Sequence, residues 1–451
     1  MKNTWLGVVL VVVTLVGGAC STGPLESSSN ASHTSAPPPE EAPVGFDNIT
    51  NGFVEQSKHW LDQSRFEETE SIAGGLGPLF NAQSCRECHQ SPVTGGVSQA
   101  TELRAGHKGP GGKFRAADVP INGGDAVIRG RTLINARAIC PSADFPNTDI
   151  QERLPESENI HTLRASISVL GSGFVEALDD ATLQGLSKKQ CAAVNSDICG
   201  QTVKVPVLES LGVTRFGRFG WKNQHASLLS FSADAYLNEM GITNELLATE
   251  VTNLCNTAPE PNDRRGADGL TDLEHFARFL RATKAPPRDA RRAATAAAKK
   301  GATLFDEIGC STCHVPTLKT APAGTPVNGG TLVVPGALGN KIFHPYSDYL
   351  LHDVGTGDGI VVAMVEHYGQ HVYDIDWKGL SLENFEETAN KIRTTPLWGV
   401  RMRPALMHDA ASLTFQDAIK RHRGEASEVT TRFQRLRHAD QDAIVEFLKS
   451  L

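Results

Sequence analysis

The stretch Ile308–His314 reads IGCSTCH, and much earlier in the chain Phe80–His89 reads FNAQSCRECH. Each ends in Cys-x-x-Cys-His. Two cysteines at this spacing are typical of a redox pair or of half a zinc site. A histidine directly after the second cysteine favours another interpretation, because Cys-x-x-Cys-His is the attachment pattern of c-type haem. The two thiols bind the haem vinyl groups, and the histidine ligates the iron from the proximal side.

Chance does not explain the repetition, because composition alone predicts about 0.006 copies of the pattern in a chain of this kind. The chain has two copies, about half a chain apart. We therefore predict two covalently bound haem c groups. The residues that attach them and ligate their irons are Cys85, Cys88, His89, Cys310, Cys313 and His314.

The segment before each motif carries a similar pattern. Arg288–Asp306 is rich in Ala and Lys and predicts a helix that leads into the second motif. Its Leu-Phe pair, ending at Phe305, corresponds to the Leu-Phe pair that ends at Phe80 before the first motif. We therefore expect similar surroundings for both haems.

A short amphipathic helix is predicted far downstream of each motif, at Thr271–Thr283 and at Ala439–Leu451. Both helices contain Phe-Leu followed by a basic residue. A motif, a variable middle and a closing helix, found twice, indicate an internal duplication. The predicted fold is mainly α, with two cytochrome c-like domains, long loops and an enlarged N-terminal half. Prolines directly after the first closing helix cannot continue it and mark the boundary between the two domains. The predicted parts of the chain are a signal peptide at 1–19, a disordered tether at 20–45, and domains at 46–284 and 288–451.

The first residues of the chain predict export. The apolar run Trp5–Val16 is typical of a signal-peptide core and is too short to span a bilayer comfortably. Small residues before Cys20 resemble a bacterial lipoprotein cleavage site, with Cys20 as the lipidated residue. Ordinary cleavage near Ala19 is the alternative, because Gly17 stands where such sites usually have Leu. Ser21–Val44 is rich in Ser, Pro, Ala and Glu, as in a disordered tether. We expect a periplasmic or membrane-tethered lipoprotein, held to the membrane by its lipid anchor only.

Four further cysteines remain outside Cys20 and the two motifs. An even number in an exported protein predicts two disulfides. Cys191 and Cys199 are close in sequence, so they are expected to pair, which leaves Cys140 for Cys255. Free buried thiols are the alternative. The net charge of −8 argues against nucleic acid as a partner.

Seven longer segments form a specific set: GLGPLFNAQSCRECH (Gly75–His89), LGSGFVEAL (Leu170–Leu178), GRFGWKNQHASL (Gly217–Leu228), EMGIT (Glu239–Thr243), PYSDYLLHDVGTG (Pro345–Gly357), RTTPLWG (Arg393–Gly399) and MHDAASLTFQDAIKRHRGEA (Met407–Ala426). With them the chain, from about residue 46 to its end, resembles the bacterial di-haem oxidoreductase ("thiol oxidoreductase") family of peroxidase-like proteins. That family is related to di-haem cytochrome c peroxidase and to MauG. Nothing in the chain itself indicates thiol chemistry.

The resemblance implies a distal ligand for the second haem. In relatives this ligand follows a helix after a His-Asp-Gly turn, and it is Met or Tyr in the best-known members. Here His422 occupies that place, so bis-His ligation by His314 and His422 is implied, which closes the iron and suits electron transfer. A surface histidine is the alternative. His408 is expected near a haem edge or propionate, although Ala410 replaces the glycine of the turn.

The resemblance also implies that the first haem is the reactive one. Glu176 matches the acid that, in relatives, moves a proton between the two oxygens of peroxide. Its apolar neighbours should desolvate it and keep it partly protonated. A glutamate that caps a helix or lies exposed on it is the alternative. Further candidates for distal, peroxide or propionate contacts are His161, His225, Arg164 and Arg218.

Trp398, and less strongly Trp221, are candidates for an electron route between the haems. His352, close in sequence to Asp348 and Asp353, is expected in a loop over the second haem, with metal ligation as the alternative. Relatives often hold calcium, but the Thr-x-Pro context is missing before the His-Asp turn here, so calcium is left unassigned.

The predicted function is that of a peroxidase-like di-haem oxidoreductase. Electrons would enter at the bis-His second haem, from a donor such as a small cytochrome or copper protein, and reach an open first haem. The small substrate would be hydrogen peroxide, which is reduced or used to oxidise a partner. The alternatives are a non-catalytic di-haem electron-transfer cytochrome and a di-haem oxygenase for an organic substrate.

Overall fold

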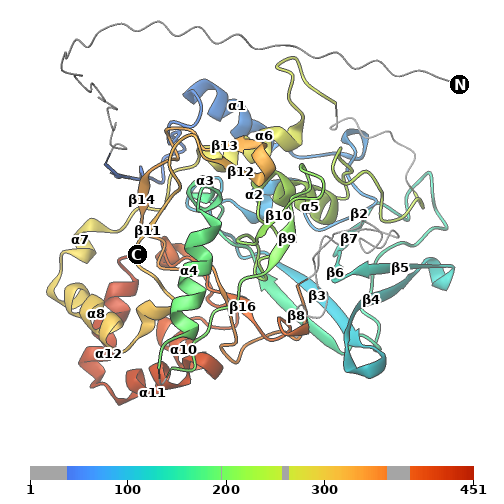
Figure 1. Cartoon of the computed structure of the whole chain (residues 1–451). Coiled ribbons are helices and arrows are strands. Elements are labelled where there is room, and N and C mark those ends of the chain that lie inside the picture. Colours follow the sequence, from blue (N-terminus) through green and yellow to red (C-terminus); the bar gives the residue numbers. More distant parts are fainter. Residues whose placement is uncertain (1–37, 195, 256–263, 363–385) are drawn as a thin grey trace, which may run out of the picture. The chain divides into compact units, whose positions relative to one another are not determined.

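The structure is a computed structural model, and it describes residues 38–194, 196–255, 264–362 and 386–451. The predicted signal peptide, Cys20 and most of the predicted tether lie outside these residues. Within the described part of the chain, none of the helices is both long enough and apolar enough to cross a membrane. Pro39–Leu451 form one compact unit, whose elements are labelled in Figure 1.

The helices lie mainly around the two motifs and at the C-terminal end of the chain (Figure 1). They are α1 (Gln56–Glu67), α2 (Cys85–Cys88), α3 (Ser172–Glu176), α4 (Asp180–Cys191), α5 (Leu228–Met240), α6 (Asp272–Ala282), α7 (Ala290–Ala293), α8 (Ala296–Glu307), α10 (Phe415–Arg421), α11 (Ser427–Arg435) and α12 (His438–Leu448).

The strands are mostly short. They are β1 (Glu40–Glu41), β2 (Leu79–Phe80), β3 (Thr101–Lys108), β4 (Phe114–Ile121), β5 (Ala126–Arg131), β6 (Leu133–Ile134), β7 (Arg137–Ala138), β8 (Ile160–Ala165), β9 (Lys204–Pro206), β10 (Thr214–Phe216), β11 (Leu318–Lys319), β12 (Pro326–Val327), β13 (Leu332–Val333), β14 (Lys341–Phe343), β15 (Leu351–His352) and β16 (Ile392–Arg393).

The fold is mixed, with 32% helix and 17% strand, so the prediction of a mainly α fold was too narrow. The largest sheet has the order β5-β4-β3-β6, and β8 also pairs with β3. Along the second half of β4, buried and exposed residues alternate, as expected for a strand with one face on a core. These strands belong to the enlarged N-terminal half. The predicted division into two domains stays a prediction.

Two helix pairs flank the two motifs. α1 packs on α6 in the first half, and α8 packs on α12 in the second. α6 begins with a capping box in which Thr271 and Glu274 bond reciprocally, and Thr295 caps α8. The predicted closing helices and the predicted helix before the second motif are therefore present, with the latter divided into α7 and α8.

The last part of the predicted tether (residues 20–45) belongs to the fold. β1 pairs in parallel with β14, with Glu40 opposite Lys341 and Glu41 opposite Ile342. Ala42 is buried in the core that contains Phe343. A composition poor in large apolar residues indicated a tether here, but backbone pairing to β14 fixes this part of it.

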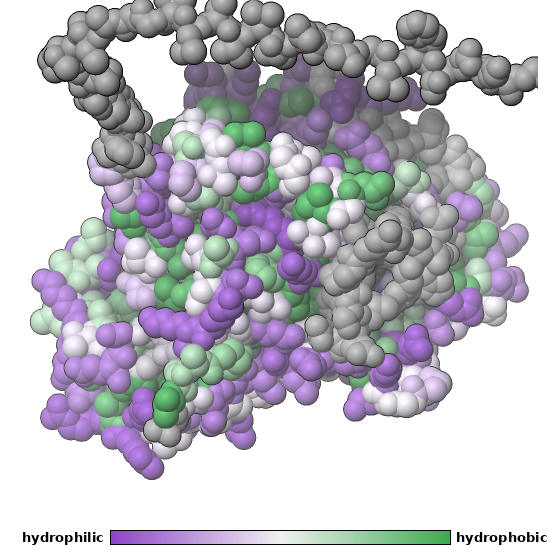
Figure 2. Space-filling view, viewed as in Figure 1, coloured by the Kyte–Doolittle hydropathy of each residue, from purple (hydrophilic) through white to green (hydrophobic). Residues whose placement is uncertain are grey.

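Both predicted disulfides are present: Cys140 bonds to Cys255, and Cys191 bonds to Cys199. The four motif cysteines take no part in a disulfide within the described residues. On the face shown in Figure 2, hydrophilic residues predominate over α11 and α12, with small hydrophobic spots between them. α11 accordingly buries only Thr430 and Phe433.

Candidate functional site

The second motif forms a tight turn at the end of α8. The 3-10 turn η4 (Cys310–Thr312) follows Gly309, whose φ of 101° favours glycine. The His314 amide donates to the Cys310 carbonyl at 3.0 Å. This turn directs both cysteines and His314 into one cavity, where a single group could be held by all three.

His422 lies across this cavity from His314. The two ring centroids are 6.5 Å apart. For two imidazoles aligned on one metal, with metal–nitrogen bonds of about 2.0–2.1 Å, the centroids would be separated by roughly 6.4 Å. The observed separation therefore fits one metal ion between the rings.

Hydrogen bonds at the far side of each ring fix its orientation. The Nδ1 atom of His314 lies 3.0 Å from the Tyr346 carbonyl, and that of His422 lies 2.8 Å from the Ala418 carbonyl. Such second-shell bonds place the proton on Nδ1 and leave the Nε2 lone pair for a metal. Burial lowers the pKa of His314 to about 4 and also lowers the pKa of His422, so both rings are neutral, as ligation requires.

The end of α10 places His422. Thr414 caps the start of this helix by accepting from the Asp417 amide, and the helix ends at Arg421. The His422 carbonyl accepts from the Thr430 hydroxyl of α11 at 2.9 Å. The predicted position of His422, directly after a short helix, is thus found in the structure.

Two arginines line the same cavity, of which Arg393 is buried and Arg403 is half-buried. Arg393 is 4% exposed and donates to the Gly220 carbonyl, while Arg403 lies over the Trp221 ring. Burial lowers the pKa of each to about 10, and within the described residues neither pairs with a carboxylate. Because an unpaired buried charge is costly, these guanidinium groups fit an anionic ligand, such as the propionates of a haem.

The cavity has a volume of about 180 Å³ and is lined mainly by apolar atoms. Its donor set combines two thiols, two neutral imidazoles and two unpaired guanidinium groups. These residues fit a covalently attached haem.

The first motif is built on α2. His89 follows its last residue, and its amide donates to the Cys85 carbonyl. The Phe66 ring of α1 lies 6.3 Å from the His89 ring at 50°, and Phe305 of α8 lies 6.1 Å from His314 at 51°. The histidines of the two motifs therefore have matching neighbours.

This match corrects the pairing of Phe80 with Phe305. Phe80 lies in β2 under the Arg137 guanidinium, whereas Phe66 packs on Phe279 just as Phe305 packs on Phe447. The Leu-Phe similarity was local, and the equivalent phenylalanine comes from the preceding helix.

The motif thiols do not resemble a redox pair. Burial raises the pKa of Cys85, Cys88 and Cys310 to about 12, whereas catalytic dithiols have a lowered thiol pKa. Burial also lowers the pKa of His89 to about 4, which keeps it neutral.

Comparison with protein families identifies the family of this chain. The family described as "Di-haem oxidoreductase, putative peroxidase" matches residues 142–451. This chain belongs to the di-haem oxidoreductase family. Membership implies two haems. The matched range contains the second motif, and the first motif precedes it.

The solved structures to which this chain is similar are distant. Hydrazine synthase of Kuenenia stuttgartiensis is 15% identical, with 99% of this chain and 100% of that chain covered and a TM-score of 0.38. A MauG-like protein associated with microbial copper homeostasis is 14% identical, with 92% and 93% covered and a TM-score of 0.39. The diheme peroxidase BthA of Burkholderia thailandensis is 15% identical, with 61% and 77% covered and a TM-score of 0.31. These scores are too low to add to the argument. A comparison with curated proteins finds no match.

Glu176 of this di-haem oxidoreductase is a fully paired carboxylate. It is 0% exposed and accepts from Arg281 at 2.7 and 2.9 Å, from the Leu228 amide at 2.8 Å and from Asn328 at 2.9 Å. Burial alone would raise its pKa, but the charge and hydrogen bonds of Arg281 outweigh burial and lower it. The expected desolvation is present, whereas the expected partial protonation is not. A proton-transfer role for Glu176 stays a prediction.

The other polar candidates are engaged elsewhere in the fold. Arg164 bonds to Asp358 at 2.7 Å, and Arg218 bonds to Asp180 and to backbone carbonyls. His161 is exposed on β8. His225 is buried, with its Nε2 atom 3.0 Å from Asp234.

His408 and Trp221 line the cavity of the second motif. Their rings are 6.0 Å apart. The Trp221 indole donates to the Ala165 carbonyl, and the Ala165 amide donates to the His408 carbonyl. Burial lowers the pKa of His408 to about 4.

Trp398 lies close to the residues that follow the first motif. A small space next to it is lined by Pro92, which follows the first motif, and by Pro396, which also lines the second cavity. At Gly171, an added Cβ would lie 3.0 Å from the Trp398 ring. Another neighbour of the first motif is Glu239, the first residue of EMGIT. Its carbonyl accepts from the Asn81 and Ala82 amides, shortly before the motif.

Sequence reasoning missed a carboxyl pair near Cys88. Glu102 and Glu239 hydrogen bond to each other, and the pKa of Glu102 is lowered whereas that of Glu239 is raised. Burial and the charge of Glu102 raise the pKa of Glu239, whereas Arg104, bonded to Glu102 at 2.8 Å, offsets burial and lowers the pKa of Glu102 to about 2. The one signal available was that Glu239 lies in a segment shared with the family.

Proposed function

We propose that this di-haem oxidoreductase is a peroxidase-type enzyme with one closed and one open haem. Both haems would be attached covalently through their Cys-x-x-Cys-His motifs. Bound haem c supplies the one-electron redox chemistry. The protein supplies the asymmetry between the two sites, and that asymmetry supports the proposal.

The proposal depends on one observation: the second site has an additional imidazole. His89 and His314 each pack against a phenyl ring, Phe66 and Phe305. His314 also faces His422 across the cavity. Among the described residues, no second imidazole packs against His89. Two imidazoles close an iron and suit electron transfer, whereas a site with one imidazole keeps a position for a small oxygen species.

Electrons would enter at the second site and move toward the first. Trp398, close to the residues that follow the first motif, is the side chain best placed to shorten that path. The donor would be a small cytochrome or copper protein, and hydrogen peroxide would be the small substrate. The apolar run and Cys20 at the start of the chain support export and tethering by a lipid anchor.

Low-temperature EPR of the purified protein during a hydrogen peroxide titration tests this proposal. We expect one low-spin signal from the bis-His site and one high-spin signal that peroxide removes. Two low-spin signals, unchanged by peroxide before and after partial reduction, would instead identify an electron-transfer cytochrome.

A further inference from the structure

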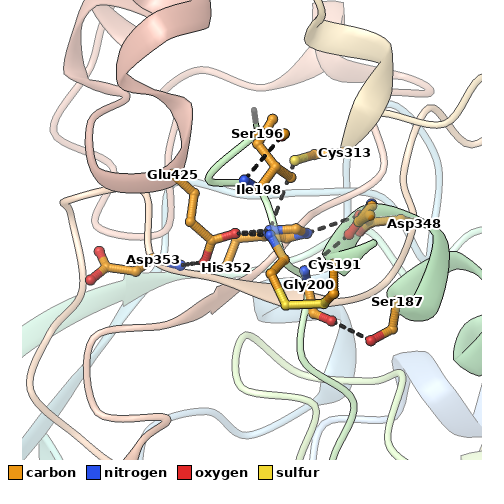
Figure 3. Close-up of a disulfide and its surroundings, with 12 residues drawn as sticks. Ser187, Cys191, Ser196, Ile198, Gly200, Cys313, Asp348, His352, Asp353 and Glu425 are labelled. Carbon is orange, nitrogen blue, oxygen red and sulfur yellow. Dashed lines mark hydrogen bonds and ion pairs between the residues drawn. A yellow bond between two sulfur atoms is a disulfide. The ribbon is translucent and has the colours of Figure 1, made fainter. Parts of the chain in front are cut away.

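His352 forms a buried ionic group beside the second motif. It is 1% exposed at the end of β15. Its Nε2 atom lies 2.9 Å from Asp348, and its Nδ1 atom lies 2.8 Å from Glu425 (Figure 3). Burial alone would lower the pKa of His352, but the charge and hydrogen bond of Asp348, with further hydrogen bonds, raise it well above its usual value. We call His352, Asp348 and Glu425 the His352 clamp.

The clamp touches the haem-attachment turn directly. The His352 Nδ1 atom lies 3.9 Å from the Cys313 sulfur. Asp348 accepts from Gln190 at 2.7 Å, and the same Gln190 amide donates to the carbonyl of Thr312, inside the motif, at 2.8 Å. A charged imidazole is thus fixed next to the sulfur that would carry the haem.

A disulfide loop holds the clamp from the other side. Glu425 accepts from the Cys199 amide at 3.0 Å, and Gln190 accepts from the Gly200 amide at 3.0 Å. The Cys191–Cys199 disulfide closes this loop. The loop belongs to the segment between the two motifs, so a segment from outside the second motif supports its cofactor.

A metal ion does not suit this cluster. Cys313, Asp348 and His352 have ligand atoms within 4.8 Å of one another. However, both ring nitrogens of His352 bond to carboxylates, and a protonated imidazole has no lone pair for a metal.

We propose that His352 is a positioning residue of the second haem, which fixes Cys313 and raises the reduction potential of that haem. This inference rests on the proposed attachment of haem at Cys310 and Cys313. The physical reason is electrostatic: a positive charge in a poorly solvated position favours the state that has gained an electron. Asp348, Glu425 and the disulfide loop keep that charge in place.

The test is a spectroelectrochemical titration of both haems in the intact holoprotein, with His352→Gln compared with His344→Gln. His344 belongs to the same segment but is 45% exposed and pairs with Glu41. For His352→Gln we expect the second haem to shift about tenfold toward its oxidised form, which equals about 59 mV for one electron. The first haem, and both haems of His344→Gln, should titrate as in the wild type.

Glu425→Gln gives an independent check with the opposite sign. It removes a negative charge from the clamp and keeps the side-chain size, so the potential of the second haem should rise. Unchanged potentials in both variants, with both haems covalently bound, would overturn the inference. If His352→Gln does not fold, the sign of the Glu425→Gln shift decides. A wild-type protein whose mass shows no haem on Cys310 and Cys313 would overturn the proposed function itself.

Discussion

The Phe66 ring packs against the His89 ring at a centroid distance of 6.3 Å, with the planes tilted by 50°. In the second half, Phe305 and His314 have nearly the same relationship, at 6.1 Å and 51°. Both phenyl groups come from the helix that precedes the motif. The two halves therefore surround the histidine of each motif alike. The sites differ on the other side of the ring, where His314 faces the imidazole of His422. Among the described residues, His89 has no such partner.

Replacing His422 by Leu should open the second site. The Nε2 lone pair across from His314 is lost, and leucine offers no ligand. We expect the low-spin bis-His EPR signal to disappear and a second high-spin signal to appear, while the signal of the first haem stays unchanged. His438→Leu is the matched control, because His438 is an exposed residue at the start of α12. A low-spin signal that survives in His422→Leu would show that another residue ligates this iron.

The features predicted correctly from the sequence are those defined by residues close together in the chain. Cys-x-x-Cys-His defines a turn within a few residues, and the closing helix at 272–282 has both a capping box and an apolar face. Cys191 and Cys199 were close enough to pair on spacing alone. Phe66 was missed because its equivalence to Phe305 rests on helix packing, which the local Leu-Phe similarity at Phe80 concealed.

Residues brought together from far along the chain were also missed. Arg393 and Arg403 look ordinary in sequence, and only the structure shows that they line a cavity and have no acidic partner among the residues it describes. Glu425 meets His352 from 73 residues away. Glu176 shows the converse case: its apolar neighbours in sequence suggested a protonated acid, but Arg281 supplies the charge that keeps it ionised.

Replacing Glu176 by Gln should destabilise the fold. Arg281 would remain buried without its carboxylate, and removing one partner of a buried pair costs about 3–5 kcal/mol. The measurement is the denaturant midpoint of the holoprotein. Glu446→Gln is the control, because Glu446 forms more exposed pairs with Arg292 and Lys449, which contribute about 0–1 kcal/mol. Normal stability with lost peroxide turnover would support the proton-transfer role instead.

Asp358 should contribute to acid unfolding. Its buried carboxylate lies 2.7 Å from Arg164 and 3.5 Å from Lys222. Burial alone would raise its pKa, but these two charges lower it to about 2. Since the unfolded pKa is about 3.9, the stabilisation of about 2.5 kcal/mol is present above that pH and is lost as the pH falls toward 2.

Unfolding of wild type and Asp358→Asn at about pH 5 and about pH 2.5 measures this contribution. The variant should be less stable at the higher pH, but it should lose less stability on acidification. Asp118→Asn is the control, since Asp118 and Arg129 are both largely exposed. Equal acid sensitivity of wild type and Asp358→Asn would show that other carboxylates dominate.

The two disulfides should differ in their contribution to stability. Cys140–Cys255 closes a loop with a sequence separation of 115, and Cys191–Cys199 closes one with a separation of 8. Loop-closure entropy in the unfolded chain predicts about 5 kcal/mol for the long loop and about 2.5 kcal/mol for the short one. Double Cys→Ser variants of each pair, unfolded in denaturant with haem attached, test this order. If the short loop contributed as much as the long one, its stabilisation would come from native contacts, such as the bond from the Cys199 amide to Glu425, rather than from chain entropy.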